Sequence, residues 1–164
     1  MSRLGPILAA TVRAAVLSGC GKPQPAADGA ATTAPPAAAA PGEADRTALL
    51  AKLPAPYNTA DLANGQAKFA LCASCHTLTA GGPNMTGPNL HGIFGSKAGA
   101  VEKFSFSDGM KASGITWDAA QMDRWITDPK AMLPDTKMTF PGFKDSKDRA
   151  DVIAYLMIET GFQP

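Results

Sequence analysis

The chain has 164 residues, of which 45% are hydrophobic and 18% are charged, and its formal net charge at pH 7 is +1. A chain of this length accommodates one domain together with additional segments. Between residues 56 and 164, ten basic residues are balanced by eleven acidic ones and form no basic stripe, so we expect no nucleic-acid partner.

Residues 1–19 are typical of a signal peptide. Arg3 gives a basic start, and the apolar run that follows, interrupted at Arg13, is too short to span a bilayer as a mature helix. The run ends in LSGC, which resembles the lipobox of bacterial lipoproteins, where the peptide is cleaved before the cysteine and the cysteine is acylated. The resemblance implies that Cys20 is a lipid anchor on the periplasmic side of a bacterial membrane; a chance cysteine after an ordinary signal peptide is the alternative.

Residues 20–55 have a different composition. They are rich in alanine and proline, and between residues 21 and 54 no aromatic side chain occurs, so most of this segment cannot build a core. We expect a flexible linker, or tether, in which residues 46–53 could form a short helix. Fully extended, residues 21–54 would reach on the order of 100 Å.

The domain that we expect over residues 56–164 is all-helical. Thr59 is a candidate cap for a first helix that runs through Leu71 into the sequence CASCH. Residues 77–99 are rich in Gly, Pro and Asn and cannot form a regular helix, whereas residues 107–111 could form one short turn.

Two further helices are predicted in the second half of the domain. Thr116 is a candidate cap for a helix that ends before Pro129, and the last helix starts at Ser146 and is stopped by Gly161. So much irregular chain in a small domain indicates that a large ligand supplies part of the core.

The sequence CASCH combines Cys72, Cys75 and His76 and has three interpretations: half of a zinc site, a redox dithiol, or the attachment point of a covalent haem. A closed zinc site needs four ligands, usually in two separated pairs, and the second pair is missing from a chain with three cysteines and two histidines. A redox dithiol normally opens a helix in a βαβ unit, but no strand-like alternation precedes Leu71.

The haem interpretation uses all three residues of the motif. Positions i and i+3 project Cys72 and Cys75 to one side of a helical turn, where each sulfur can bond one haem vinyl group. His76, at position i+4, can direct its ring at the iron as the proximal ligand. The motif therefore predicts one covalently bound haem c.

His91 and six internal methionines are candidates for the other side of the iron. Met122 and Met157 lie on apolar helical stripes, which assigns them to the core. Met132 and Met138 share the Pro-rich loop DPKAMLPDTKMTFPGF, and spacing does not choose between them. Two more lie in polar stretches without a clear role: Met85 and Met110.

Several ordered motifs between Gly65 and Leu156 resemble those of class I cytochromes c: GQAKFALCASCH, GPNLHGIFG, GITW, DPKAMLPDTKMTFPGF and RADVIAYL. The resemblance implies an all-α cytochrome c fold, with three to five helices and loops wrapped around one haem. It also implies that the first and last helices cross closely at Gly65. In this family the TKM loop supplies a thioether ligand, which falls on Met138, and the carbonyl of Pro88 accepts a hydrogen bond from the proximal histidine. By the same resemblance His91 is a surface residue.

The resemblance also assigns residues around the haem propionates. Trp117 and Thr136 keep hydrogen-bond donors that family members use there. Ser96 stands where arginine is frequent, and Phe106 and Trp125 stand where tyrosine is frequent. With fewer donors, one propionate is expected to be more exposed, or to have a higher pKa, than in typical relatives.

A haem with both axial positions filled by protein has no place for a substrate, so we expect a one-electron carrier and not an enzyme. As partners we expect a quinol-oxidising complex as donor and a terminal oxidase or reductase as acceptor, in a respiratory or photosynthetic chain, with membrane lipid bound through Cys20 and the protein a monomer. Two alternatives stay open. The domain could be a fixed electron-entry subunit of a larger oxidoreductase, or a peroxidase-like haem enzyme if Met138 is not a ligand.

Overall fold

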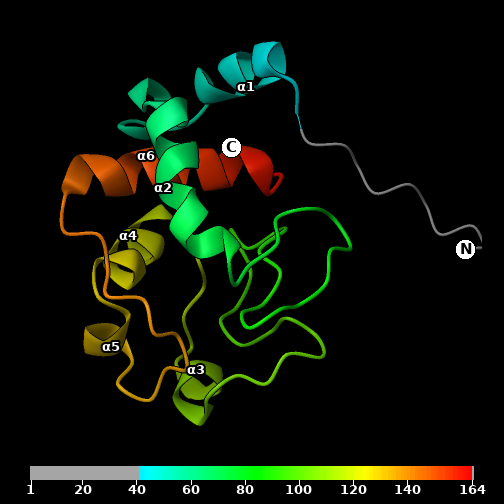
Figure 1. Cartoon of the computed structure of the whole chain (residues 1–164), viewed down its shortest axis with the longest axis vertical. Coiled ribbons are helices and arrows are strands. Elements are labelled where there is room, and N and C mark those ends of the chain that lie inside the picture. Colours follow the sequence, from blue (N-terminus) through cyan, green and yellow to red (C-terminus); the bar gives the residue numbers. More distant parts are fainter. Residues whose placement is uncertain (1–40, 164) are drawn as a thin grey trace, which may run out of the picture. The chain divides into compact units, whose positions relative to one another are not determined.

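The computed structural model describes residues 41–163, which form six α-helices and one short 3-10 helix, with no β-strand in that range (Figure 1). The expected all-α fold class is confirmed. The helices are α1 (Glu43–Leu50), η1 (Tyr57–Thr59), α2 (Leu62–Ala73), α3 (Asp108–Ala112), α4 (Ala119–Thr127), α5 (Pro129–Met132) and α6 (Ser146–Glu159).

The N-terminal cap of α2 is Asp61, so the prediction of Thr59 is wrong. The Asp61 side chain accepts a hydrogen bond from the Asn64 N–H at 3.0 Å, whereas the Thr59 hydroxyl donates to the Pro56 carbonyl at 3.1 Å within η1. A carboxylate beside the first turn satisfies a free N–H and interacts favourably with the helix dipole.

The same correction applies to α4. Its cap is Asp118, whose Oδ1 accepts from the Gln121 N–H at 2.7 Å, while Thr116 pairs with Lys97 in an isolated β-bridge. In both cases an aspartate two residues after the predicted threonine lies directly before the first helical turn. The helix ends before Pro129, as predicted.

Helix α5 was not predicted from the sequence; with it, residues 56–163 contain five α-helices, within the three to five that the resemblance implied. The carboxylate of Asp128 accepts from the Ala131 N–H at 3.1 Å, and Pro129 occupies the first turn, where its missing N–H costs nothing. Proline therefore ends α4 and also begins α5. The turn expected at residues 107–111 is α3, capped by the Ser107 side chain.

Helices α2 and α6 cross in close contact, as the resemblance implied (Figure 1). A Cβ on Gly65 would lie 2.3 Å from the Asp151 carbonyl oxygen and 2.9 Å from Tyr155 Cβ, so only glycine fits at this point. Beside it, the rings of Phe69 and Tyr155 pack with centroids 5.6 Å apart. The crossing fixes the helix that carries the CASCH turn.

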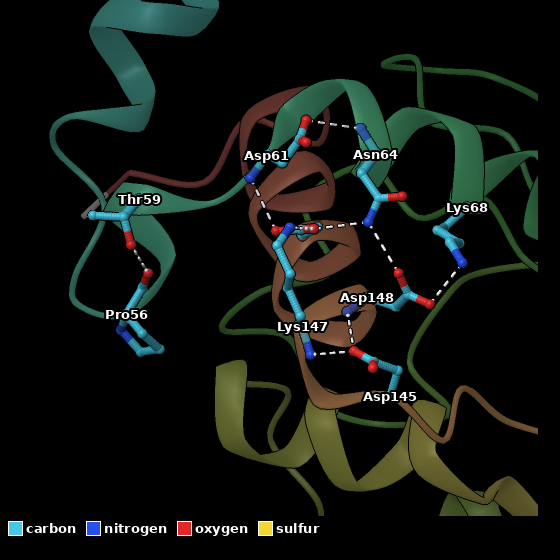
Figure 2. Close-up of polar contacts among 9 residues, drawn as sticks. Pro56, Thr59, Asp61, Asn64, Lys68, Asp145, Lys147 and Asp148 are labelled. Carbon is cyan, nitrogen blue, oxygen red and sulfur yellow. Dashed lines mark hydrogen bonds and ion pairs between the residues drawn. The ribbon is translucent and has the colours of Figure 1, made fainter.

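A polar network completes the crossing (Figure 2). The carboxylate of Asp151, a residue only 1% exposed, accepts hydrogen bonds from the Asp61 N–H at 2.9 Å, from Asn64 Nδ2 at 2.8 Å and from Lys147 Nζ at 2.7 Å. Burial alone would raise the pKa of Asp151, but these hydrogen bonds outweigh it and the pKa is lowered.

Asp148 joins the two helices one turn away from Asp151. Its carboxylate accepts from Asn64 Nδ2 at 3.0 Å and from Lys68 Nζ at 2.6 Å (Figure 2). These hydrogen bonds, from Asn64 first and then Lys68, lower the pKa of Asp148. Two carboxylates of α6 therefore hold side chains from the first two turns of α2.

Helix α1 lies within the segment 20–55 that we expected to be a linker. Its Arg46 Nε donates to Glu159 Oε1 of α6 at 2.5 Å, and Leu53, which follows it, is 5% exposed. Helix α1 docks on the domain because its apolar side chains Leu49 and Leu50 also pack against the core. The earlier part of the expected linker lies outside the described residues, as do the expected signal peptide and Cys20.

The core gathers on α6, where Val152, Ile153 and Met157 are at most 1% exposed. Met122 and Met157 are buried, in agreement with their assignment to the core. Within residues 41–163, no helix has the length and hydropathy that crossing a bilayer requires.

Candidate functional site

A cavity of about 470 Å³ opens between the C-terminal end of α2, the loops of residues 86–107 and the segment 136–141. Its size is in the range of cofactor pockets, which is roughly 300–1,000 Å³. Most of its wall is apolar; the larger side chains include Phe69, Ile93, Val101, Phe104, Phe140 and Leu156.

The CASCH turn places its three functional side chains on the wall of this cavity. Helix α2 ends at Ala73, and the N–H groups of Cys75 and His76 then both donate to the Cys72 carbonyl, at 2.9 and 3.0 Å. Cys72, Cys75 and His76 all line the cavity. The spacing thus brings the three residues together.

His76 is held from behind by the GPN segment. Its Nδ1 lies 2.7 Å from the Pro88 carbonyl oxygen, which can only accept, so Nδ1 carries the proton and Nε2 keeps its lone pair. A Cβ on Gly87 would lie 2.4 Å from His76 Cε1, so glycine makes room for the ring. Burial lowers the pKa of His76, and the hydrogen bond to Pro88 opposes this effect in part. The lowered pKa favours the neutral imidazole that a metal needs.

Two other interpretations of the motif find no support in this geometry. Burial, and then the neighbouring Cys75, raise the pKa of the Cys72 thiol to about 11, whereas redox dithiols have a lowered pKa. Among residues 41–163, no group of three or more His, Cys, Asp or Glu side chains is arranged to hold a metal ion. No disulfide joins the two cysteines of the motif.

The methionines divide by position. Met138 lines the cavity, and Met132, the other methionine of its loop, lies at a separate shallow pocket beside Arg124. Met110 and Met122 also contribute to the cavity wall. Met110 has no clear role from its polar surroundings in the sequence; its place three residues after the Ser107 cap turns it inward, where it is 7% exposed.

The residues expected around the haem lie at the cavity as well. Trp117 and Thr136 line it, and Trp117 is 5% exposed. Phe106 and Trp125 line it too, whereas the Ser96 hydroxyl donates to the Ile93 carbonyl at 2.7 Å. The Ser96 hydroxyl is therefore already engaged with its own backbone.

Leu71 is a site residue that the sequence did not suggest. It lines the cavity directly before Cys72 and is 63% exposed, which places it at the mouth. Met85, at 47%, is the other large hydrophobic residue with high exposure among residues 41–163. His91 is exposed, with Nδ1 3.2 Å from the Leu78 carbonyl, and does not line the cavity.

The donor set fits a covalently bound haem. The apolar wall suits a porphyrin, two adjacent thiols can form thioethers, and an imidazole nitrogen and a methionine sulfur are both available to iron.

Comparisons with known proteins point the same way. The family model described as Cytochrome c matches residues 62–158. Cytochrome c2 of Blastochloris viridis is 44% identical over 108 residues, which cover 66% of this chain and 85% of that protein. Cytochrome c of Kluyveromyces lactis is 40% identical over 106 residues, 64% of this chain and 96% of that protein. Among solved structures, cytochrome cH from Methylobacterium extorquens is 46% identical with a TM-score of 0.55, covering 58% of this chain and 96% of that one.

Proposed function

The chain belongs to the cytochrome c family, and on that premise we propose that it is a membrane-tethered monohaem carrier of single electrons between periplasmic redox partners. Members of this family bind one haem c covalently and act as electron carriers, not as enzymes. The observation that carries the proposal is the placement of Cys72, Cys75, His76 and Met138 on the wall of one apolar cavity.

In this proposal Cys72 and Cys75 attach the haem, and the haem supplies a one-electron iron couple. His76 presents Nε2 to the iron, and the Pro88 carbonyl fixes the orientation of its ring through the 2.7 Å contact. Such a contact also makes Nε2 a stronger electron-pair donor to a metal, because the Nδ1–H group donates a hydrogen bond to the Pro88 carbonyl.

Met138 would supply the second protein ligand to the iron. Of the three methionines on the wall, Met110 and Met122 lie on α3 and α4, and both are buried. Met138 lies on a loop, in the TKM motif of the family, and a loop can bring its sulfur to the iron without the constraint of a helix. A thioether ligand and an apolar pocket both favour ferrous iron, as a carrier of high reduction potential requires.

Electrons would enter and leave at the mouth of the cavity, beside Leu71. Among the described residues, the cavity is lined by two lysines, Lys97 and Lys137, and by no carboxylate, and Lys137 keeps its charge while it donates to Ser105. As partners we propose a quinol-oxidising complex as donor and a terminal oxidase or reductase as acceptor, with the carrier acting as a monomer. Small contacts suffice for such transient exchange.

The tether rests on the sequence before the described residues. We propose that residues 1–19 are removed, that Cys20 is acylated, and that a linker follows. Since Arg46 and Leu53 pack on the domain, the free linker would end near Gly42 and not at residue 55. About 22 residues in a polyproline-like conformation reach roughly 70 Å, at about 3.1 Å each. A tether of this reach raises the effective concentration of the carrier near membrane partners.

The first test is spectroscopic. We expect the full chain, produced with a working haem-ligation apparatus, to give a pyridine haemochrome typical of two thioether bonds, and its ferric form to show the near-infrared methionine-to-iron band. Met138→Ala should abolish this band, while the matched loop variant Met132→Ala should keep it. Colourless protein would refute the proposal. A wild type without the band that binds peroxide rapidly would favour the peroxidase-like alternative.

The second test concerns the membrane. Cys20→Ala should move the haem protein from the membrane fraction to the soluble periplasmic fraction, and Lys22→Ala, a control beside it, should not. If detergent releases the wild-type protein as a stable complex with other subunits, the result would favour a fixed electron-entry subunit over a mobile carrier.

A further inference from the structure

We propose that Asp135 is a positioning residue for Met138, because its carboxylate fastens the ligand loop to helix α3 on another part of the cavity wall. The inference rests on the proposed function, in which Met138 binds iron. Asp135 Oδ2 accepts a hydrogen bond from the Gly109 N–H at 2.7 Å, across 26 residues of chain.

The loop presents Asp135 through a tight turn. The Thr136 N–H donates to the Leu133 carbonyl at 3.0 Å, which closes a turn with Pro134 and Asp135 at its centre. Proline at the second position of a turn has its backbone angle already set, so the position of Asp135 is well defined. Two residues further on, the Met138 N–H donates to Thr136 Oγ1 at 3.2 Å. The turn thus joins Asp135 closely to Met138.

Helix α3 is built to receive this carboxylate. The Ser107 side chain already accepts from the Met110 N–H at 3.2 Å, and the Gly109 N–H, also in the first turn, needs a partner. A Cβ on Gly109 would lie 2.3 Å from Asp135 Oδ1, so the absence of a side chain lets the carboxylate approach. On the inner side of α3, Met110 is buried and lines the cavity.

A second contact runs parallel to the first. Lys137 Nζ donates to the Ser105 carbonyl at 2.7 Å and to Ser105 Oγ at 2.9 Å. Asp135 and Lys137 lie on either side of Thr136, and both reach the segment 105–109. We call these two contacts the loop clasp. They hold the three residues before Met138 against a neighbouring part of the wall.

The loop clasp acts on the balance between bound and released Met138. Releasing the sulfur requires segment 136–141 to move away from the cavity, and this movement is easier when the loop is free of α3. Loss of one exposed hydrogen bond of this kind should raise the population with Met138 released by about three- to tenfold. Asp135 makes no contact with the iron itself in this account.

Cyanide binding to the ferric holoprotein measures that population, because cyanide needs the position that Met138 occupies. We expect Asp135→Ala to bind cyanide about three- to tenfold faster than wild type, with a weaker near-infrared band. The matched control is Asp108→Ala, which removes a fully exposed carboxylate on the same short helix, where the nearest cation, Lys111 Nζ, is 3.7 Å away. This control should bind cyanide at the wild-type rate.

Two further variants separate positioning from a general loss of stability. Asp135→Asn keeps an oxygen acceptor for Gly109 and should restore most of the wild-type cyanide rate. Gly109→Ala should displace the carboxylate and match Asp135→Ala, and the double variant should add little, because both remove one contact. If Asp135→Ala behaves like Asp108→Ala while wild type shows the methionine band, the clasp is refuted and the carrier function stands. Absence of the band in wild type would refute Met138 ligation itself, and the clasp proposal with it.

Discussion

At the crossing of α2 and α6, protein atoms fill the space: a glycine admits a backbone carbonyl, and the buried carboxylate of Asp151 has three donors. The loops of residues 86–107 and 136–141 do the opposite, because their apolar side chains surround a cavity of about 470 Å³. The side chains of the crossing pack against one another without a ligand, whereas the loops around the cavity form a packed core only around a large ligand.

The difference bears on stability. The cavity has a mouth beside Leu71 and a mostly apolar wall, so without a haem these apolar side chains face water. Removing apolar surface from water is worth roughly 25 cal/mol per Å², and domains have a total stability of only about 5–15 kcal/mol. We therefore expect the haem to be a structural element as well as a redox centre.

The largest effect should follow from removal of the haem. The double variant Cys72→Ala, Cys75→Ala cannot form thioethers, so we expect the helical signal in far-ultraviolet circular dichroism at 25 °C to be mostly lost, while the haem-loaded wild type keeps it. A haem-free variant that unfolds in a cooperative thermal transition would show that the crossing folds by itself, and the contrast between the two regions would fail.

Within the crossing, Gly65→Ala should have the next largest effect. The added Cβ would meet the Asp151 carbonyl at 2.3 Å, and backbone cannot move away cheaply. We expect a loss of about 3 kcal/mol in the free energy of unfolding of the holoprotein, measured with denaturant. The neighbouring exposed residue gives the control, since Gln66→Ala should change this value by less than about 0.5 kcal/mol.

Asp151→Asn should cost about 1–3 kcal/mol at pH 7, because it weakens three hydrogen bonds to a buried carboxylate. The pKa of Asp151 is lower in the folded protein than its usual value near 3.9, so its contribution is present above that value and is lost as the pH falls through the folded pKa. The stability difference between variant and wild type should therefore shrink below about pH 4. A difference that is constant from pH 7 to pH 3 would contradict this role of the charge.

The smallest effect is expected at the mouth of the cavity. Leu71→Lys places a cation beside the proposed electron-transfer edge, so reduction of ferricyanide-type anions by the ferrous protein should become about twofold faster at low salt. Ala70→Lys, one residue away in α2 and not part of the cavity wall, should have less effect. Equal rates for both variants would mean that electrons do not leave beside Leu71.

Structural elements were predicted correctly from the sequence where a local pattern has only one interpretation. The start of α6 at Ser146, its stop at Gly161, which has a φ of +79°, and the irregular stretch after the CASCH turn follow from local signals and agree with the structure. The caps Thr59 and Thr116 were wrong because an aspartate two residues later competes for the same helix start, and propensity alone does not choose the register.

Other features depend on contacts that sequence spacing does not carry. Docking of α1 requires a partner for Arg46 that is 113 residues away, and the inward position of Met110 depends on how α3 is capped. The choice between Met132 and Met138 likewise depended on the course of the loop, or on resemblance to a family, and not on the spacing of the two residues.

The pairing of Arg46 with Glu159, whose side chain is only 6% exposed, bears on how the domain should be truncated for laboratory work. A fragment that starts at Pro56 would lack α1, so the Glu159 carboxylate would lose its Arg46 partner and apolar side chains at the C-terminal part of α6 would be exposed to water. Such a fragment would tend to stick to other copies of itself. A fragment that starts at Pro41 would keep α1 packed on α6 and should stay monomeric.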